Sequence, residues 1–311
     1  MKLSGNITHT VLMIRPKNFA FNAETAENNS FQIKDTSMND KSVSLEAVKE
    51  FDGMVEKLKY HGINVLVYED TDSPLTTDAV FPNNWFTTHA DGKIISYPME
   101  AVSRRNERRE DIIEDLIQKY MYTNRYGFEY LEEENAFLEG TGSMVFDRDH
   151  RMIYACLSSR TSIEALEKCS VLLGYRKLIF HAFDRMGNTI YHTNVMMCVG
   201  DRFAVVCLES VRDLEEREAL RSSLEKSGKT IIEINFDQMH SFAGNMLQLY
   251  SDSGRSVLIM SESAFKSLNW EQLDKLKMFN EVLPIKVDTI EKASGGSVRC
   301  MMAEIFPSVN L

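Results

Sequence analysis

The feature that most constrains the fold is a repeated alternation of strand-like and helical runs along the chain. Five stretches carry helical periodicity. They begin near Asn39, Ser103, Thr161, Ser210 and Ser261, all of which are suited to N-capping a helix. The starts recur at intervals of roughly 50 to 60 residues, which is within the range of repeat architectures. We therefore expect an α/β protein of five repeated strand–helix units, with a doubly wound α/β sheet as the alternative.

Each helical stretch has apolar residues that indicate which face is buried. The first helix, expected over about residues 39–60, has Leu45, Val48, Phe51, Val55 and Leu58 on one face. In the third, Thr161 and Glu164 match a capping box. The apolar positions expected in the second and fourth helices are Ile112, Ile113, Leu116, Ile117, Val211, Leu214, Leu220 and Leu224.

Short apolar runs between the helices are typical of strands. The expected strands are Thr10–Ile14, Ile63–Tyr68, Lys93–Tyr97, Met152–Leu157, Arg202–Cys207, Lys229–Ile234, Asn245–Tyr250, Ser256–Met260 and Val282–Val287. No stretch rich in Pro, Gly or Ser divides the chain, so we expect a single domain over residues 1–311.

Charge, apolar runs and cysteine content disfavour several classes of protein. The formal net charge of -11 disfavours nucleic acid and anionic membranes as partners, because both attract a basic surface. No run approaches the roughly 20 apolar residues of a membrane span, and Val11–Ile14 is too short for a signal-peptide core. The five cysteines form no CxxC pair, which disfavours disulfides and a zinc site and favours a cytoplasmic location.

Cys300 is the first candidate for chemistry. It follows Gly295 and Gly296 in the segment Ala293–Cys300, and glycines allow close backbone approach or positive φ. A cysteine just after such a turn can face a cavity, although a buried core thiol is the alternative. The other four cysteines lie in apolar runs or on helical faces, and we interpret them as core residues.

His192 and Glu139 are candidates for activating such a thiol. Alternation places His192 and Asn194 on one side of an expected strand. A thiol requires a base or cation nearby to become a thiolate at neutral pH. Glu139, among apolar and glycine residues, could orient an imidazole and stabilise its charged form. A structural histidine and a turn glutamate are the alternatives.

Two polar segments could bind a ligand. Thr77–Trp85 contains Asp78, Asn83 and Asn84 beside large aromatic residues. It offers donors and acceptors to a planar polar group, and otherwise it is a turn leading into a strand. Ser103–Arg109 places four arginines at an expected helix start, where the dipole disfavours cations. An anion nearby, or a solvated charged face, would account for them.

Together these segments resemble the guanidine-modifying enzymes, the pentein superfamily. This group includes arginine deiminase, dimethylarginine dimethylaminohydrolase and the amidinotransferases. The resemblance runs from Arg15-Pro16 to Cys300 and follows the order of short motifs in that family. The block from Phe21 to Ala26 looks closest to citrulline-utilisation-type hydrolases. The motifs are Asp78-x4-Asn83-Asn84, Ser103-Arg104-Arg105, Glu139-Gly140, Ser158-x-Arg160-Thr161, His192-x-Asn194 and Gly295-Gly296-x3-Cys300.

The resemblance implies a five-bladed α/β propeller around a central substrate cavity. It also implies a cytoplasmic hydrolase of the amidinotransferase-like family that binds a small amino acid without metal or organic cofactor, with homodimerisation left open. It assigns Cys300 as nucleophile, His192 as acid–base and Glu139 as the adjacent carboxylate. It assigns Arg105 and Arg160 to the substrate's α-carboxylate and Asp78 to its side-chain nitrogens.

Three asparagines depart from the family pattern. Guanidine-binding members carry acids where this chain has Asn83 and Asn84, and arginine deiminase carries one at the position of Asn194. Because an asparagine offers a donor and an acceptor without charge, these residues suit a neutral ureido group better than a guanidinium. We therefore expect a citrulline-like substrate. The alternatives are a guanidine substrate, and a non-catalytic binding protein with the same fold.

Overall fold

The computed structural model describes residues 5–34 and 39–308, and it has five sheets of three strands each. In every sheet the central strand pairs antiparallel with one neighbour and parallel with the other. We call each sheet with its helices a blade. In spatial order the strands are β15 (Ala303–Ile305), β1 (Thr10–Arg15) and β2 (Asn64–Glu69); β3 (Phe86–Thr88), β4 (Lys93–Ser96) and β5 (Asn124–Gly127); β6 (Val145–Asp147), β7 (Met152–Cys156) and β8 (Arg176–Phe180); β9 (Met197–Val199), β10 (Phe203–Val206) and β11 (Thr230–Glu233); β12 (Leu247–Tyr250), β13 (Ser256–Ser261) and β14 (Glu281–Ile285).

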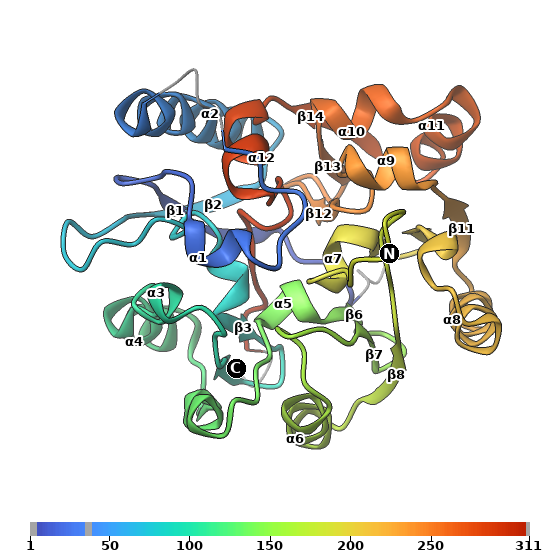
Figure 1. Ribbon diagram of the computed structural model, residues 1–311, viewed down its shortest axis with the longest axis horizontal. Helices are drawn as coiled ribbons and strands as arrows, with labels where there is room; N and C mark the ends of the chain where they lie inside the picture. Colours follow the sequence, from blue (N-terminus) through green and yellow to red (C-terminus); the bar gives the residue numbers. More distant parts are fainter. Residues whose placement is uncertain (1–4, 35–38, 309–311) are drawn as a thin grey trace.

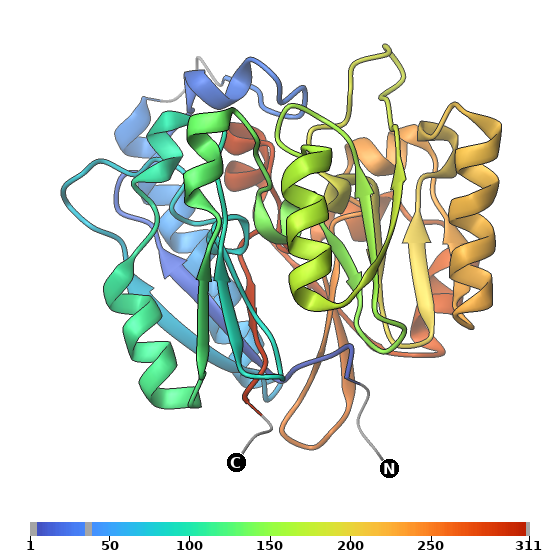
Figure 2. The ribbon, with the colours of Figure 1, turned by 90° about the horizontal axis from the view of Figure 1, so that it is seen from below.

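Helices connect the parallel strands of each blade, and the longer ones surround the sheets (Figure 1). In Figure 2, α6 (yellow-green) and α8 (yellow-orange) stand outside the strands of similar colour. These connecting helices are α2 (Asp40–Tyr60), α3 (Val102–Arg105), α4 (Glu110–Tyr120), α6 (Ile163–Leu173), α8 (Leu214–Lys226), α10 (Glu262–Ser267) and α11 (Trp270–Lys277).

Some of the shorter elements lie near the centre of the ring. Figure 1 shows four of these helices, α1, α5, α7 and α12, around the middle of the molecule. The short elements are α1 (Ala23–Ala26), α5 (Gly140–Ser143), α7 (Thr193–Met196), α9 (Phe236–His240) and α12 (Asp288–Ser294), with the 3-10 turns η1 (Pro82–Asn84), η2 (Glu129–Glu134) and η3 (Leu208–Ser210).

The five expected strand–helix units are confirmed, and the fold is the five-bladed α/β propeller. All nine expected strands are present, with ends that differ by one or two residues. The first blade contains strands from both ends of the chain, because β15 pairs with β1. None of the described helices is long and apolar enough to cross a membrane.

Several local expectations were wrong. In α2 the buried positions are Val43, Ala47, Phe51, Met54 and Leu58, whereas Leu45 is 55% exposed. The buried face is therefore rotated from the expected one, because Val43, Ala47 and Met54 pack against the neighbouring core.

Three helix starts also differ from expectation. Ser103 lies inside α3, and the helix expected after it, α4, begins at Glu110 after the N-cap residue Arg109. Ser162, rather than Thr161, caps α6 by accepting a hydrogen bond from the Ala165 N–H. Asp213 caps α8, several residues after Ser210, and Leu214 is exposed. In α6 and α8 the residue that caps is the one whose side chain reaches the free N–H groups of the first turn.

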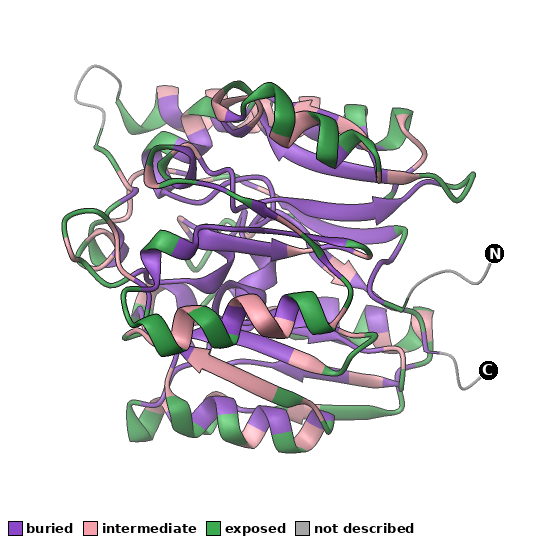
Figure 3. Cartoon of the chain, turned by 90° about the vertical axis from the view of Figure 1, so that its right-hand side faces the viewer, coloured by how far each residue is buried: buried purple, intermediate pink, exposed green. Residues whose placement is uncertain are grey.

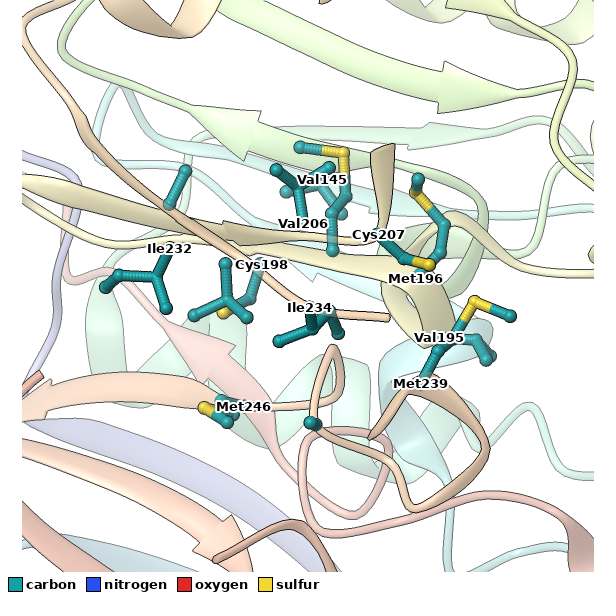
Figure 4. Packing of buried hydrophobic residues seen from close by; sticks show 14 of the residues in the cluster. Val145, Val195, Met196, Cys198, Val206, Cys207, Ile232, Ile234, Met239 and Met246 are labelled. Carbon is teal, nitrogen blue, oxygen red and sulfur yellow. The ribbon is translucent and has the colours of Figure 1, made fainter. Parts of the chain in front are cut away.

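The core lies between the sheets and the helices that cover them. Figure 3 shows buried strands and helices with one exposed face. In the fourth blade, Val195 and Met196 of α7 pack with Cys207 and Met239 in one apolar cluster (Figure 4). This packing anchors α7, the short helix that follows His192.

Candidate active site

The turns that lead into the first strand of the blades supply the central polar residues. Asn84 lies two residues before β3, and Asn245 lies two residues before β12. Asn194 and Cys300 lie three residues before β9 and β15. The repeat therefore brings side chains that are distant in sequence to the axis of the ring.

Cys300 lines a cavity of about 300 Å³ together with His192, Asp78 and Asn84. The Cys300 thiol is 4% exposed. Gly295 ends α12 with a φ of 67°, which confirms the expected tight turn before the cysteine. Burial raises the pKa of the other four cysteines, to about 11 for Cys156 and about 12 for the remaining three.

His192 is paired with Glu139 inside the protein. The distance from His192 Nε2 to Glu139 Oε2 is 2.8 Å, and both residues are buried. Burial lowers the pKa of His192 to about 4, although Glu139 opposes this shift. Burial raises the pKa of Glu139, but Arg160 and His192 outweigh it and lower that pKa to about 2. The resting pair is therefore a neutral imidazole beside a carboxylate.

The prediction of a strand that contains both His192 and Asn194 was wrong. His192 has extended backbone, but Thr193–Met196 form the short helix α7, so alternation does not place Asn194. Asn194 instead contacts the sulfur, with its Nδ2 3.5 Å from Cys300 Sγ. It lines a second cavity of about 460 Å³ rather than the one that Cys300 lines.

The Asp78 and Asn84 side chains leave hydrogen-bonding atoms free in the first cavity. Asp78 Oδ2 accepts from Asn22 Nδ2 at 2.8 Å, and Asn84 Oδ1 accepts from Arg104 at 2.9 Å. Among the described residues, Asp78 Oδ1 and Asn84 Nδ2 are buried without a hydrogen-bond partner. Burial raises the pKa of Asp78, and nearby Arg104 opposes that shift. Asn83 lines neither cavity and donates to Thr141 Oγ1 at 3.1 Å.

The cavity contains Arg104 rather than Arg105. Arg104 is 3% exposed and forms a bidentate ion pair with Glu107 at 2.8 and 2.9 Å. Arg105 lies outside the cavity, where it pairs with Glu132 and donates to the Met99 carbonyl oxygen. Two of the four arginines, Arg104 and Arg105, therefore lie at the end of α3, and the other two lie just before α4.

Arg160 lines the cavity and contacts the segment that contains Thr25 and Asn28. Its Nη2 donates to the Thr25 carbonyl oxygen at 3.0 Å, and its Nε donates to Asn28 Oδ1 at 3.0 Å. Its Nη1 is 3.6 Å from Glu139 Oε2. Thr25 and the buried Asn29 also line the cavity from this segment.

Gly142 keeps the centre of the site open. A Cβ at this position would lie 2.5 Å from Asn84 Nδ2 and 2.6 Å from His192 Nδ1. His192 Nδ1 and the unpartnered Asn84 Nδ2 therefore border the same small space. A side chain there would displace one of the two groups.

Sequence reasoning did not identify Asn22, Arg104 or Asn245 as site residues. Asn22 and Arg104 belong to segments that it had singled out, but their roles depend on contacts across the ring. Asn245 was expected only as the first residue of a strand. In the structure it lies two residues before β12, as Asn84 lies two residues before β3, but this equivalence could not be seen in the sequence. No group of three His, Cys, Asp or Glu suited to a metal occurs in the described part of the chain.

Solved structures with this fold are similar to most of the chain at low identity. An arginine dihydrolase of cyanobacteria, ArgZ, has a TM-score of 0.74 and 15% identity over 97% of this chain and 41% of its own. Its N-terminal domain has a TM-score of 0.72 and 15% identity, with 96% of this chain and 99% of that domain covered. A dimethylarginine dimethylaminohydrolase has a TM-score of 0.66 and 14% identity, with 96% and 100% covered.

A family profile matches nearly the whole sequence. The chain spans less than half of full-length ArgZ, and no curated protein sequence matches it. The matching profile is described as N,N dimethylarginine dimethylhydrolase, eukaryotic, and it covers residues 15–307. The chain therefore belongs to this dimethylarginine dimethylhydrolase family of the pentein superfamily.

Proposed function

We propose that the protein is a cysteine hydrolase that cleaves a C–N bond in the ureido group of a citrulline-like amino acid. Cys300 is the nucleophile, and His192, paired with Glu139, is the acid–base. The observation that carries the substrate class is the pair of unpartnered atoms in the cavity, one acceptor on Asp78 and one donor on Asn84.

The orientation of the Asn84 amide supports a neutral substrate. Arg104 has only donors, so the Asn84 atom that it contacts must be the oxygen. The Asn84 NH₂ group is then the free one, and it requires an acceptor. A ureido group has a carbonyl oxygen for Asn84 and N–H groups for Asp78, whereas a guanidinium has N–H groups alone. A guanidinium would leave the buried Asn84 donor unpaired.

In the proposed reaction, His192 carries a proton in each of two steps, first from the Cys300 thiol to the leaving nitrogen and then from water to the released sulfur. His192 takes the thiol proton as the sulfur attacks the ureido carbon, and Glu139 stabilises the imidazolium. The C–N bond breaks, and the leaving nitrogen takes that proton. Water then attacks the carbon–sulfur intermediate with His192 as base, and the thiol is restored. The chemistry requires neither a metal nor an organic cofactor.

Arg160 is the proposed contact for the substrate's α-carboxylate, because it is the cavity arginine without a bidentate carboxylate partner. Arg104 replaces Arg105 as the site residue of the Ser-Arg-Arg motif, with a role in orienting Asn84. Relatives of the same fold support a covalent route. ArgZ was captured covalently bonded to a reaction intermediate, and a dimethylarginine dimethylaminohydrolase as an adduct with S-methyl-L-thiocitrulline.

A guanidine substrate is the second candidate. Asp78 favours it, since a buried carboxylate with a free oxygen would pair with a guanidinium. The relative ArgZ is an arginine dihydrolase. Under this alternative the chain would act on arginine or a methylated arginine, or transfer an amidino group to an amine.

The test is a parallel assay of purified protein with citrulline, arginine, methylated arginines and agmatine, with products identified by mass spectrometry. We expect the highest kcat/KM with citrulline and no turnover in the Cys300→Ala variant, which should fold normally. Faster turnover of arginine than of citrulline would overturn the ureido assignment. Normal turnover in Cys300→Ala would overturn the nucleophile.

Thiol reactivity separates an enzyme from a non-catalytic binding protein. We expect iodoacetamide to alkylate Cys300 faster than a free model thiol at pH 7, because an activated thiol has more thiolate character. Alkylation at the rate of a free model thiol, together with no turnover of any substrate, would favour a binding protein.

A further inference from the structure

Asn245 contacts the sulfur of Cys300 from a blade that supplies no other proposed site residue. Its Nδ2 lies 3.4 Å from Cys300 Sγ, and Asn245 is 1% exposed. Asn194 approaches the same sulfur with its Nδ2 at 3.5 Å. Two side-chain amides therefore converge on one thiol in the centre of the ring.

The neighbours of Asn245 determine which end of its amide faces the sulfur. Asn245 Oδ1 accepts from the Arg299 N–H at 3.1 Å, and its Nδ2 donates to the Asn194 carbonyl oxygen at 3.0 Å. A flipped amide would place two oxygens together and two N–H groups together. The NH₂ group is therefore the end of the amide nearer to the sulfur, with Nδ2 at 3.4 Å and Oδ1 at 3.8 Å from Cys300 Sγ, and its second hydrogen is available to the sulfur.

The amide pair lies outside the cavity that is lined by Cys300 and His192. Asn194 lines the second cavity, whereas Cys300 and His192 line the cavity proposed for the substrate. Asn245 lines neither cavity, so both amides can remain in contact with the sulfur while the substrate occupies the first cavity. The Arg299 side chain is directed elsewhere, since it pairs with Glu304 and donates to the Met302 carbonyl oxygen.

We propose that Asn194 and Asn245 form a thiolate-binding pair that stabilises negative charge on Cys300 Sγ by donating two N–H groups to it. This inference rests on the proposed role of Cys300 as nucleophile. When the thiol proton moves to His192, Glu139 stabilises the cation and the two amides stabilise the anion. The same donors act when water opens the intermediate, because the sulfur then leaves as a thiolate.

A neutral donor pair suits this position for a physical reason. Hydrogen bonds to charged acceptors are stronger than those between neutral groups, so the pair favours the thiolate over the thiol. An acid at either position would repel the thiolate. A cation would stabilise it but would disfavour the imidazolium that forms beside it.

The test measures alkylation of Cys300 by iodoacetamide from pH 6 to pH 10, with the modified residue identified by mass spectrometry. The variants are Asn245→Ala, Asn194→Ala and the isosteric Asn245→Asp, which keeps the acceptor for Arg299. Asn280→Ala is the matched control, because Asn280 is buried and hydrogen-bonded but bonds to Gln248 and Leu276. Circular dichroism checks that each variant folds.

We expect Asn245→Ala to slow alkylation about tenfold at pH 7, the effect of losing a hydrogen bond to a charged group. The difference from the wild type should shrink as the pH rises to 10, because a higher hydroxide concentration offsets the lost stabilisation of the thiolate. Asn245→Asp should slow the reaction further at pH 7, and Asn280→Ala should not change it. A pH-independent loss would indicate blocked access and overturn the proposal, as would an unchanged rate in both alanine variants.

Failure of the two proposals can be told apart. If wild-type Cys300 resists alkylation at pH 7 in folded protein and no substrate turns over, the nucleophile itself is wrong. If wild-type Cys300 reacts rapidly and the asparagine variants behave like the wild type, only the thiolate-binding pair is wrong.

Discussion

At the scale of single residues, the site holds a neutral imidazole next to charged groups. Burial lowers the pKa of His192 to about 4 despite the carboxylate of Glu139 2.8 Å away. Arg160 and Arg104 both lie within 4 Å of Glu139 and share its charge. The imidazole is thus free to accept a proton, and the carboxylate is ready to stabilise the cation once it forms.

This arrangement predicts a low acid limit for activity. The proton-accepting form of His192 is present above a pH of about 4 and is lost as the pH falls through that value. We expect kcat/KM to hold between pH 7 and 5 and to decline below about pH 4 to 5, as measured in overlapping buffers. A decline centred near 6.5, the value of an unperturbed histidine, would contradict the assignment. Replacing Glu139 by Gln should move the limit to lower pH, because the carboxylate raises that pKa, and should reduce kcat.

Asn84 is the residue at which substrate preference can be reversed. Asn84→Asp keeps the oxygen that accepts from Arg104 and replaces the free donor by an acceptor. Asp78 and residue 84 would then both present acceptors to the substrate's side-chain group, which suits a guanidinium. We expect kcat/KM for citrulline to fall at least about tenfold and that for arginine to rise, since an unpaired buried group costs about 1–3 kcal/mol. A matched Asn83→Asp variant tests the specificity of the effect, because Asn83 lines neither cavity. An equal loss for both substrates in Asn84→Asp would contradict the prediction.

At the scale of elements, long apolar runs were predictable and short connecting pieces were not. The central strands β7, β10 and β13 are almost entirely buried and contain continuous apolar runs. Strands β3, β6, β9 and β15 have three residues each, which is too short for a periodic signal. Helices α5 and α7 have four residues each and contact each other across the blades, where Thr193 Oγ1 donates to the Ser143 carbonyl oxygen.

The site residues also divide into those that the sequence predicted and those that it did not. Motif order identified Cys300, His192 and Glu139, which the ring brings to one region, with His192 and Cys300 lining the cavity and Glu139 paired with His192. Asn245 meets Cys300 across 55 residues of sequence, and no local pattern encodes that contact. Arg104 and Arg105 are adjacent in α3, and only the packing of this short helix decides which one faces the cavity.

Helix α2 provides a direct test of the corrected buried face. Phe51 is fully buried, whereas Leu45 was expected on the same face and is 55% exposed. Phe51→Ala should reduce the free energy of unfolding by about 3–5 kcal/mol, because it leaves a cavity in the core. Leu45→Ala should change it by less than about 0.5 kcal/mol. Urea denaturation followed by circular dichroism measures both, and similar losses in the two variants would mean that the expected face was correct.

At the scale of the whole molecule, the position of Cys300, the proposed nucleophile, depends on closure of the ring. β15 pairs with β1, so the last strand completes the first blade. Cys300 lies three residues before β15, and Thr8 Oγ1 donates to the Ile305 carbonyl oxygen on that strand. The turn that presents the sulfur is thus connected to strands from both ends of the chain. We infer that loss of this closure would disturb the site and weaken all five blades together.

Ile305→Ala tests whether the ring is stabilised as one unit. Ile305 is fully buried in a cluster with Leu12 and Trp85, and its truncation should cost about 2–5 kcal/mol. If the blades unfold together, native-state hydrogen exchange should show the same loss of protection in β10 of the fourth blade as in β1. Ile232→Ala, a buried truncation in the fourth blade, is the reciprocal control and should reduce protection in β1 equally. Losses confined to the first blade in one variant and to the fourth in the other would show that the blades open independently. In that case the position of Cys300 would depend on the first blade alone.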